Sequence, residues 1–151
     1  MGRNKLGIAP IKPYLKKIDA VKTSKDLQAL LIEMEPLGGI GFFGANVGPD
    51  AKNSNRNVLS VGPGGVGLPD RDYYVSDDAD SKEKREKYVA HVTKMLAFLG
   101  EKPAEAKMHA EKILALEIEM SKPRFDRVER RDRRKSYNPM TVADLQKLTP
   151  S

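Results

Sequence analysis

Glycine is concentrated in one part of this 151-residue chain, where nine of the twelve glycines lie within residues 38–67. Glycine weakens helices and favours turns and close backbone approaches, so a long helix cannot run through this part of the chain. Apolar residues over 42–47 and 57–61 predict two short strands, and the polar stretch 48–56 is predicted to be the loop between them. The middle of the chain is therefore predicted to hold a β-hairpin.

The run that follows the second strand, Gly62-Pro63-Gly64-Gly65, predicts irregular structure. The whole range 38–69 is accordingly interpreted as a Gly-rich hairpin and an ordered loop. Two matches to G-x-G-x-x-G fall within it, at 39–44 and 62–67. A dinucleotide site needs such a motif between a strand and a helix, and neither match has that setting. Both matches are predicted to be tight turns, and no cofactor-binding residue is predicted.

The segment before the glycines predicts a pair of amphipathic helices. Apolar residues recur at intervals of three and four over 10–20, which is typical of one short helix. Thr23 and Asp26 have the spacing of a capping box, and a second apolar stripe continues from there to Met34.

Two longer helices are predicted beyond the glycines. Asp78 or Asp80 is placed to cap a helix whose apolar stripe extends over 88–99, with Gly100 at its C′ position. Pro103 is suited to the first turn of the next helix, and the short connection predicts an antiparallel pair.

The spacing of Thr141 and Asp144 predicts one more capped helix near the end of the chain. With 39% hydrophobic residues, the chain can form a modest core, and no apolar run approaches the ~20 residues that span a bilayer. We predict a mainly α fold of about five helices with one small β-hairpin.

Cysteine is absent, which excludes disulfides, thiolate zinc sites and cysteine nucleophiles. The two histidines, His91 and His109, are not spaced as the His pair of a zinc peptidase helix, and both are predicted to be ordinary helix residues. Three acids at 77, 78 and 80 lack the glycine and distal glutamate of a calcium loop, so capping explains them better. No metal-binding residue is predicted in this chain.

The net charge of +6 arises almost entirely from one segment. Residues 122–135 carry eight Lys or Arg against three acids, and the wider range 122–140 is interpreted as a basic connector. Its interleaved acids favour a solvated connector with local ion pairs over a nucleic-acid site. The alternative is a stand-alone helical module that binds an acidic partner through 122–135.

Residues 70–74 form a dense polar and aromatic cluster of two aspartates, one arginine and two tyrosines. Paired carboxylates can divide acid and base work in an independent enzyme. The structural interpretation is that Arg71 pairs with acids, the tyrosines anchor the loop and an aspartate caps a helix. We favour the structural interpretation, and no catalytic residue is predicted.

Several short motifs in this order resemble one known family. They are Asp50-Ala-Lys52-Asn53-Ser54, Gly67-Leu68-Pro69-Asp70-Arg71-Asp72-Tyr73-Tyr74, Tyr88-Val89-Ala90-His91, Leu116-Glu117 and Tyr137-Asn138-Pro139-Met140-Thr141. From about Leu6 to Thr149, the chain resembles the N-terminal helical lobe of the neprilysin, endothelin-converting enzyme and PepO family of zinc metalloendopeptidases. The residues taken as its structural signature are Gly67, Leu68, Pro69, Arg71, Asp72, Tyr73, Tyr74, Tyr137, Asn138 and Met140.

The resemblance implies a zinc-dependent parent enzyme that hydrolyses peptides within a chamber between two lobes. The family binds zinc through a His-Glu-x-x-His helix and a downstream glutamate, and that motif does not occur in this sequence. The chain is therefore expected to wall the chamber, to bind no zinc itself and to be inactive alone.

The resemblance also implies partners and a location. We expect a fragment incomplete at both ends, with the remaining catalytic lobe as its partner and peptides as the parent's substrates. A homodimer through exposed former interfaces is a further possibility, and no nucleic acid is expected. The lack of cysteine fits a bacterial member, and the parent is expected outside the cytoplasm, in the periplasm, at the cell surface or secreted.

Overall fold

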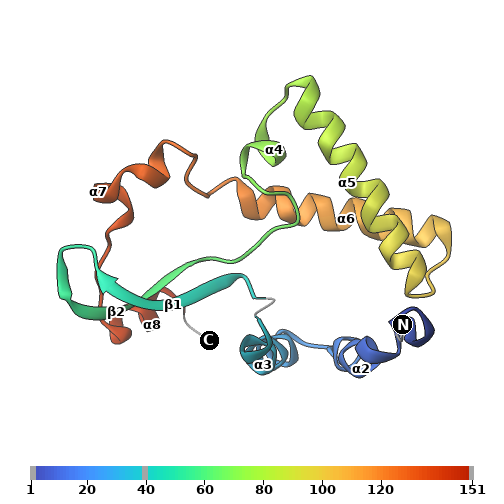
Figure 1. Ribbon diagram of the computed structural model, residues 1–151, viewed down its shortest axis with the longest axis horizontal. Helices are drawn as coiled ribbons and strands as arrows, with labels where there is room; N and C mark the ends of the chain where they lie inside the picture. Colours follow the sequence, from blue (N-terminus) through green and yellow to red (C-terminus); the bar gives the residue numbers. More distant parts are fainter. Residues whose placement is uncertain (1–2, 39–40, 150–151) are drawn as a thin grey trace.

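The computed structural model describes residues 3–38 and 41–149 as an open frame made of helices and one hairpin, which forms one side of it (Figure 1). The two long helices α5 (Ala79–Phe98) and α6 (Pro103–Ser121) form one part of the frame, and the hairpin and the first helices lie apart from them. The predicted mainly α fold with one small hairpin is confirmed. None of the described helices combines the length and the apolar character that a membrane crossing requires.

The first part of the chain is a row of short helices that bury little of their apolar surface. These are α1 (Arg3–Leu6), the 3-10 turn η1 (Ala9–Ile11), α2 (Lys12–Asp19), α3 (Ser24–Met34) and the 3-10 turn η2 (Glu35–Leu37). The predicted capping box is present, because Thr23 accepts from the backbone of Asp26 and Asp26 accepts from the backbone of Thr23. An ion pair between Lys17 and Glu33 joins α2 to α3. Leu30 is the buried apolar residue of this part, whereas Ile32 is 75% exposed.

The hairpin consists of β1 (Phe43–Asp50) and β2 (Asn53–Pro63), paired antiparallel. The prediction of a loop over 48–56 is wrong, because the strands continue to a tight turn at residues 51 and 52. The backbone N–H of Lys52 donates to Oδ1 of Asp50 at 2.9 Å and so closes the turn with a side chain rather than with glycine. The register shifts between Pro49 and Asp50, so the polar residues beside the turn are irregularly paired rather than unpaired.

The prediction of irregular structure is also wrong at its first two residues, since Gly62 and Pro63 still belong to β2. Gly62 is paired with Gly44, and Pro63, which has no N–H to donate, occupies the last position of the strand. Gly64 then crosses the start of β1, where its N–H donates to the carbonyl of Phe42 at 2.7 Å. A Cβ at Gly64 would overlap the Gly41 carbonyl, so this crossing requires glycine.

The long helices pack as the predicted antiparallel pair. Asp78 caps α5 by accepting from the N–H of Ser81 at 2.8 Å, and Gly100, with a φ of 104°, ends it. Pro103 lies in the first turn of α6, as predicted. Ala106 and Ala110 are fully buried, so small side chains allow the two helices to approach closely.

The short helix α4 (Asp72–Val75) packs against both long helices and buries Tyr74 to 3% exposure. After α6 the chain forms the 3-10 turn η3 (Glu129–Arg131), α7 (Arg133–Ser136) and α8 (Val142–Leu148). The predicted capping box of Thr141 and Asp144 begins α8. Tyr74, Ala106, Ala110 and Leu30 are the buried apolar residues of the described chain, a very small core for its length.

Candidate functional site

The signature residues separate into two clusters. The segment 67–74 forms a loop and α4 beside α5 and α6, and together with Glu117 we call it the loop cluster. Residues 137–140 connect α7 to α8 and reach the hairpin turn, where Asp50, Lys52, Arg56 and Tyr137 form what we call the turn cluster. The two motifs of the signature thus hold different parts of the frame (Figure 1).

Glu117 of α6 anchors the backbone of the loop cluster. Its Oε1 accepts from the N–H of Gly67 at 2.9 Å, and its Oε2 accepts from the hydroxyl of Tyr74 at 2.9 Å. The same hydroxyl accepts from the N–H of Leu68 at 2.6 Å. One carboxylate and one phenol therefore satisfy two consecutive backbone donors that no regular element pairs.

Two tyrosines beside this carboxylate are held in their neutral form. Burial raises the pKa of Tyr74 well above its ordinary value, and the neighbouring Glu117 raises it further. Burial, with Glu117 again contributing, raises the pKa of Tyr88 to about 12. A Cβ at Gly67 would overlap the Tyr88 hydroxyl, so the loop also passes closely over α5. These phenols act as hydrogen-bonding anchors and not as bases near neutral pH.

Asp70 connects the loop cluster to the basic connector. Its Oδ2 accepts from Nε of Arg127 at 3.1 Å and from Nη2 of Arg130 at 2.8 Å, and its Oδ1 accepts from the N–H of Asp72 at 3.2 Å. The backbone N–H of Asp72, followed by the two guanidinium groups, lowers the pKa of Asp70. The carboxylate is thereby committed to structure and is not available as a general acid or base.

The remaining residues of the loop cluster also make structural contacts. Arg85 of α5 donates from Nη1 to the carbonyls of Tyr73 at 2.6 Å and Ser76 at 2.9 Å. Lys84 lies 5.1 Å from the centre of the Tyr73 ring. Arg71 contacts its neighbour Asp72 at 3.3 Å. These contacts agree with the structural interpretation of residues 70–74, and they bring no nucleophile next to a base.

The turn cluster is built on Asp50, which is 4% exposed. It accepts from the hydroxyl of Tyr137 at 3.0 Å and forms an ion pair with Arg56. The backbone N–H of Lys52, followed by Arg56, lowers the pKa of Asp50 to about 2. The ammonium group of Lys52 lies 4.5 Å from the centre of the Tyr137 ring, a cation–π distance.

The last two signature residues differ in their surroundings. Asn138 donates from Nδ2 to the carbonyl of Lys135 at 2.9 Å and so caps the end of α7. Met140 is 49% exposed. The structure therefore gives Asn138 a local role and leaves about half of Met140 exposed to solvent.

The two histidines lie on different long helices, His91 on α5 and His109 on α6, and Nδ1 of His109 contacts Oε2 of Glu101 at 2.9 Å. Over residues 3–38 and 41–149, no three side chains of His, Cys, Asp or Glu are grouped closely enough to hold a metal ion. The described side chains therefore form no group suited to a zinc centre, and we assign no step of zinc chemistry to them.

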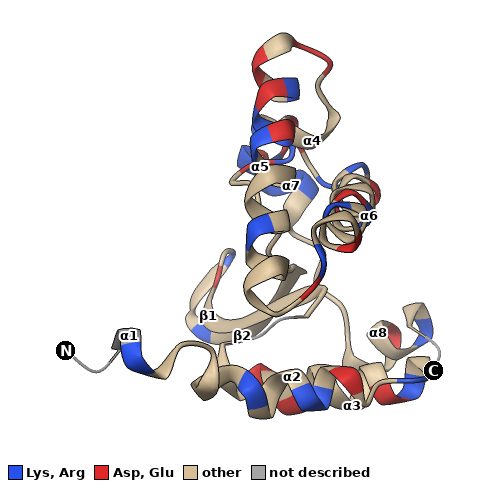
Figure 2. Ribbon diagram, turned by 90° about the vertical axis from the view of Figure 1, so that its right-hand side faces the viewer, with Lys and Arg blue, Asp and Glu red and all other residues tan. Residues whose placement is uncertain are grey.

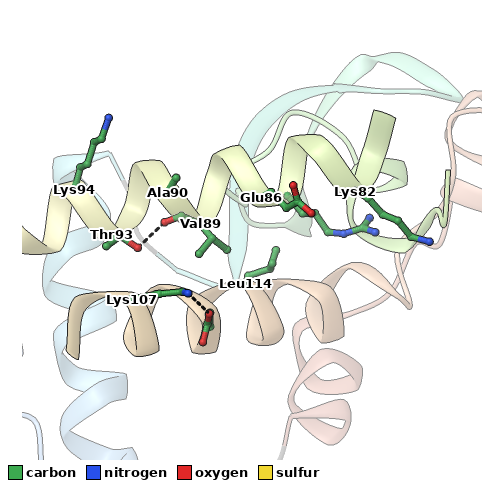
Figure 3. Close-up of a pocket in the computed structure, with 10 residues that line it drawn as sticks. Lys82, Glu86, Val89, Ala90, Thr93, Lys94, Lys107 and Leu114 are labelled. Carbon is green, nitrogen blue, oxygen red and sulfur yellow. Dashed lines mark hydrogen bonds and ion pairs between the residues drawn. The ribbon is translucent and has the colours of Figure 1, made fainter. Parts of the chain in front are cut away.

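A groove of about 770 Å³ runs along one side of α5 and α6 (Figure 3). Val89, Ala90 and Leu114 form its apolar part, and the rest is lined by charged side chains and Thr93. Thr93 donates to the carbonyl of Val89 at 2.8 Å, so its hydroxyl is already used within the helix. The groove brings together no acid–base pair or nucleophile of the kind that an active site requires.

The basic connector is largely paired with acids. Lys135 contacts Glu129 at 2.9 Å and Arg134 contacts Asp132 at 3.3 Å, while Arg127 and Arg130 bind Asp70. Basic and acidic residues also alternate along the long helices (Figure 2). These pairs reduce the positive charge available to an acidic partner, and binding through 122–135 stays a prediction.

Sequence reasoning missed the residues that hold the two clusters from a distance. Arg127 and Arg130 were assigned only to a solvated connector, and Arg56 to a loop. Glu117 was noted only within the motif Leu116-Glu117, and its anchoring role could have been inferred because it interrupts the apolar stripe of its helix. A charged residue on the packed face of a helix usually has a partner there.

The sequence matches the family model of peptidase family M13 over residues 2–151. Endothelin-converting enzyme 1 of Cavia porcellus is 36% identical over 112 residues, which are 73% of this chain and 15% of that enzyme. Neprilysin-3 of Drosophila melanogaster is 30% identical over 109 residues, which are 72% of this chain and 14% of that protein. The chain thus spans about one seventh of the length of these relatives.

Solved structures share the fold. The zinc metalloprotease Zmp1 of Mycobacterium tuberculosis, in complex with an inhibitor, superposes with a TM-score of 0.86 and 30% identity over 95% of this chain and 22% of that one. PepO from Lactobacillus rhamnosis superposes with a TM-score of 0.82 over 95% of this chain and 23% of that one. At 17% identity, the second comparison bears on the fold alone.

Proposed function

The chain belongs to peptidase family M13, and on that premise we propose that it forms part of the helical lobe of a zinc-dependent endopeptidase. The observation that carries the proposal is the superposition of 95% of the chain, at a TM-score of 0.86, on 22% of a zinc metalloprotease. A segment of a larger enzyme that retains its fold this closely is expected to retain its place in that enzyme.

The role proposed for this segment is to wall the substrate chamber. The loop cluster and the turn cluster are built from carboxylates and phenols that are already bound to backbone or to cations. These carboxylates and phenols stabilise the wall, and because each is already bound, we do not expect them to activate water. Zinc and the groups that act on the peptide bond belong, in this proposal, to the remaining lobe of the same protein.

The proposal includes the substrate class and the location of the complete protein. A chamber enclosed by two lobes restricts access to peptides and short unfolded segments, so we propose that short peptides are cleaved and folded proteins are not. We place the complete protein outside the cytoplasm, and fractionation of the source organism tests that placement.

The test is to purify the complete gene product that contains this sequence and to measure its zinc content and its hydrolysis of short peptides. We expect about one zinc ion per molecule and hydrolysis of short peptides that is lost on chelation and regained with zinc. Folded proteins that contain the same peptide sequences should not be cleaved. The matched control is the 151-residue chain, which should neither hydrolyse peptides nor retain zinc.

Two results would overturn the proposal. A complete gene product that is metal-free and inactive would remove the peptidase assignment. Hydrolysis by the purified 151-residue chain that a chelator abolishes would show that the chain is catalytic and not a wall.

A further inference from the structure

The hairpin has one apolar face and one polar face. In the register of the strands, Val47 is paired with Leu59, Ala45 with Val61 and Phe43 with Pro63. Residues paired across antiparallel strands point to the same side of the sheet, so these six form one surface, which we call the apolar face. The other side carries Asn46 paired with Ser60, Gly44 paired with Gly62 and Gly48 paired with Val58, so it has a single large apolar side chain.

In a stable sheet the apolar side is covered and the polar side faces solvent, whereas in this hairpin the apolar side is the exposed one. The apolar face is open to solvent, with exposures of 64% for Phe43, 69% for Val47 and 64% for Leu59. The opposite side contains the partly covered residues, among them Gly48 and Val58. An isolated two-stranded sheet is marginal in water and needs packing on its hydrophobic side. The apolar face therefore requires a cover that the described residues do not supply.

The accessible surface of the whole chain is larger than that of a compact protein of the same mass. The chain exposes 11969 Å², whereas a compact protein of its mass exposes about 7,700 Å². The excess is roughly 4,300 Å² on this one chain. A standard interface covers about 800 Å² on each partner, and even a large obligate dimer covers about 2,500 Å² on each. One interface with a second copy would thus leave much of the excess of the whole chain exposed, whereas the rest of a larger polypeptide could cover it.

We propose that the apolar face is the surface on which this segment docks against the part of its own M13 polypeptide that lies outside these 151 residues. The inference rests on the proposed function, since it takes the partner to be the rest of the peptidase. The related mycobacterial enzyme supports this choice, because the matched segment is only 22% of that chain. The two strands carry charge only at Asp50 and Arg56, beside the turn (Figure 2). The six residues of the apolar face are uncharged, and an uncharged, apolar surface is the cover that suits them.

The test uses single thiols, which the absence of cysteine from this chain makes possible. Val47→Cys and Leu59→Cys place a thiol on the apolar face. Asn46→Cys and Ser60→Cys are matched controls, one residue away on the same strands and on the opposite side. Each variant is made in the 151-residue chain and in the complete gene product, and alkylation at the named position is followed by peptide mass spectrometry. Light scattering gives the oligomeric state of each sample.

We expect the thiols of Val47→Cys and Leu59→Cys to react freely in the 151-residue chain and at least about ten-fold more slowly in the complete gene product. The control thiols should change much less. Equal reactivity of the apolar-face thiols in both proteins would overturn the inference. Protection already present in a dimeric 151-residue chain would also overturn it, because the cover would then be a second copy.

The zinc content and peptide hydrolysis of the same preparations separate this inference from the proposed function. An active zinc peptidase with freely reacting apolar-face thiols refutes the docking surface and leaves the function in place. Protected thiols in a complete gene product without zinc or hydrolysis refute the function and leave the docking surface in place. A gene product that ends at 16.8 kDa refutes both.

Discussion

The hydroxyl of Tyr137 donates a hydrogen bond of 3.0 Å to Oδ1 of Asp50, which lies 87 positions earlier in the sequence. This contact joins the connection between α7 and α8 to the turn of the hairpin. It therefore brings together Asp50 and Tyr137, which belong to two of the motifs that carry the family resemblance.

Removing this hydroxyl should loosen the hairpin turn. In Tyr137→Phe, the ring remains over Lys52 but Asp50 loses one of its donors. We expect a small decrease in melting temperature and faster amide exchange over 50–57, measured by hydrogen–deuterium exchange. Tyr14→Phe is the control, since no hydrogen bond of the Tyr14 hydroxyl occurs within the described residues. Unchanged exchange over 50–57 would show that the contact does not hold the turn.

The turn cluster should lose stability in acid. The backbone N–H of Lys52 and then Arg56 lower the pKa of Asp50 from 3.8 to about 2. The unfolded chain therefore binds a proton at a higher pH than the folded chain does. The contribution of Asp50 is full above about pH 4 and is lost as the pH falls toward about 2. Urea unfolding from pH 5 to pH 2 should show a shallower pH dependence in Asp50→Asn.

The matched control for this pH series is Asp77→Asn, because the side chain of Asp77 is 96% exposed. That variant should keep the pH dependence of the unmodified chain. If Asp50→Asn kept it as well, other carboxylates would account for the loss of stability in acid.

Gly64 should not tolerate a methyl group. A Cβ there would overlap the backbone of Gly41 and Phe42, whereas a Cβ at the neighbouring Gly65 meets no atom within 4 Å. We expect Gly64→Ala to lower the free energy of unfolding by about 1–3 kcal/mol. Gly65→Ala should stay within about 0.5 kcal/mol of the unmodified protein. Equal effects of the two substitutions in denaturant titrations would contradict the close crossing.

Both oxygens of the Glu117 carboxylate should be required for the stability of the loop cluster. Glu117→Gln keeps one acceptor but turns an amide donor toward either Gly67 or Tyr74, both of which already donate. We expect a loss of about 1–3 kcal/mol in the free energy of unfolding. Glu119→Gln, on an exposed position of the same helix, is the control and should change little. Because Glu117 contributes to the raised pKa of Tyr88, a spectroscopic titration should also show this phenol ionising at a lower pH in Glu117→Gln than in the unmodified protein.

Local features of this fold could be predicted from the sequence. The capping boxes at Thr23 and Thr141, the helix end at Gly100 and the helix start at Pro103 were all correct. Each depends on atoms within a few residues, which a sequence window contains. The strand-like pattern around residues 42–47 was also real.

Features that depend on distant residues were not predictable in the same way. The strands of the hairpin were predicted too short. The polar residues near the turn are held by Asp50 and by pairing across the strands, and their own strand propensities are low. The partners of Asp70 lie 57 and 60 positions away, at Arg127 and Arg130. Helical spacing also could not show that much of each apolar stripe stays exposed, since that depends on how the helices pack and not on their own sequence.

The contact between Asp50 and Tyr137 can also be considered as the closure of a chain loop. For a flexible segment of 87 residues, the length-dependent entropy of closure is about 4 kcal/mol, more than a single hydrogen bond returns. The segment is not flexible, because α5 and α6 are paired and Asp70 holds the residues that follow α6. The helix pair has therefore already brought the two ends near each other, and a weak contact is enough to hold Tyr137 against the hairpin turn.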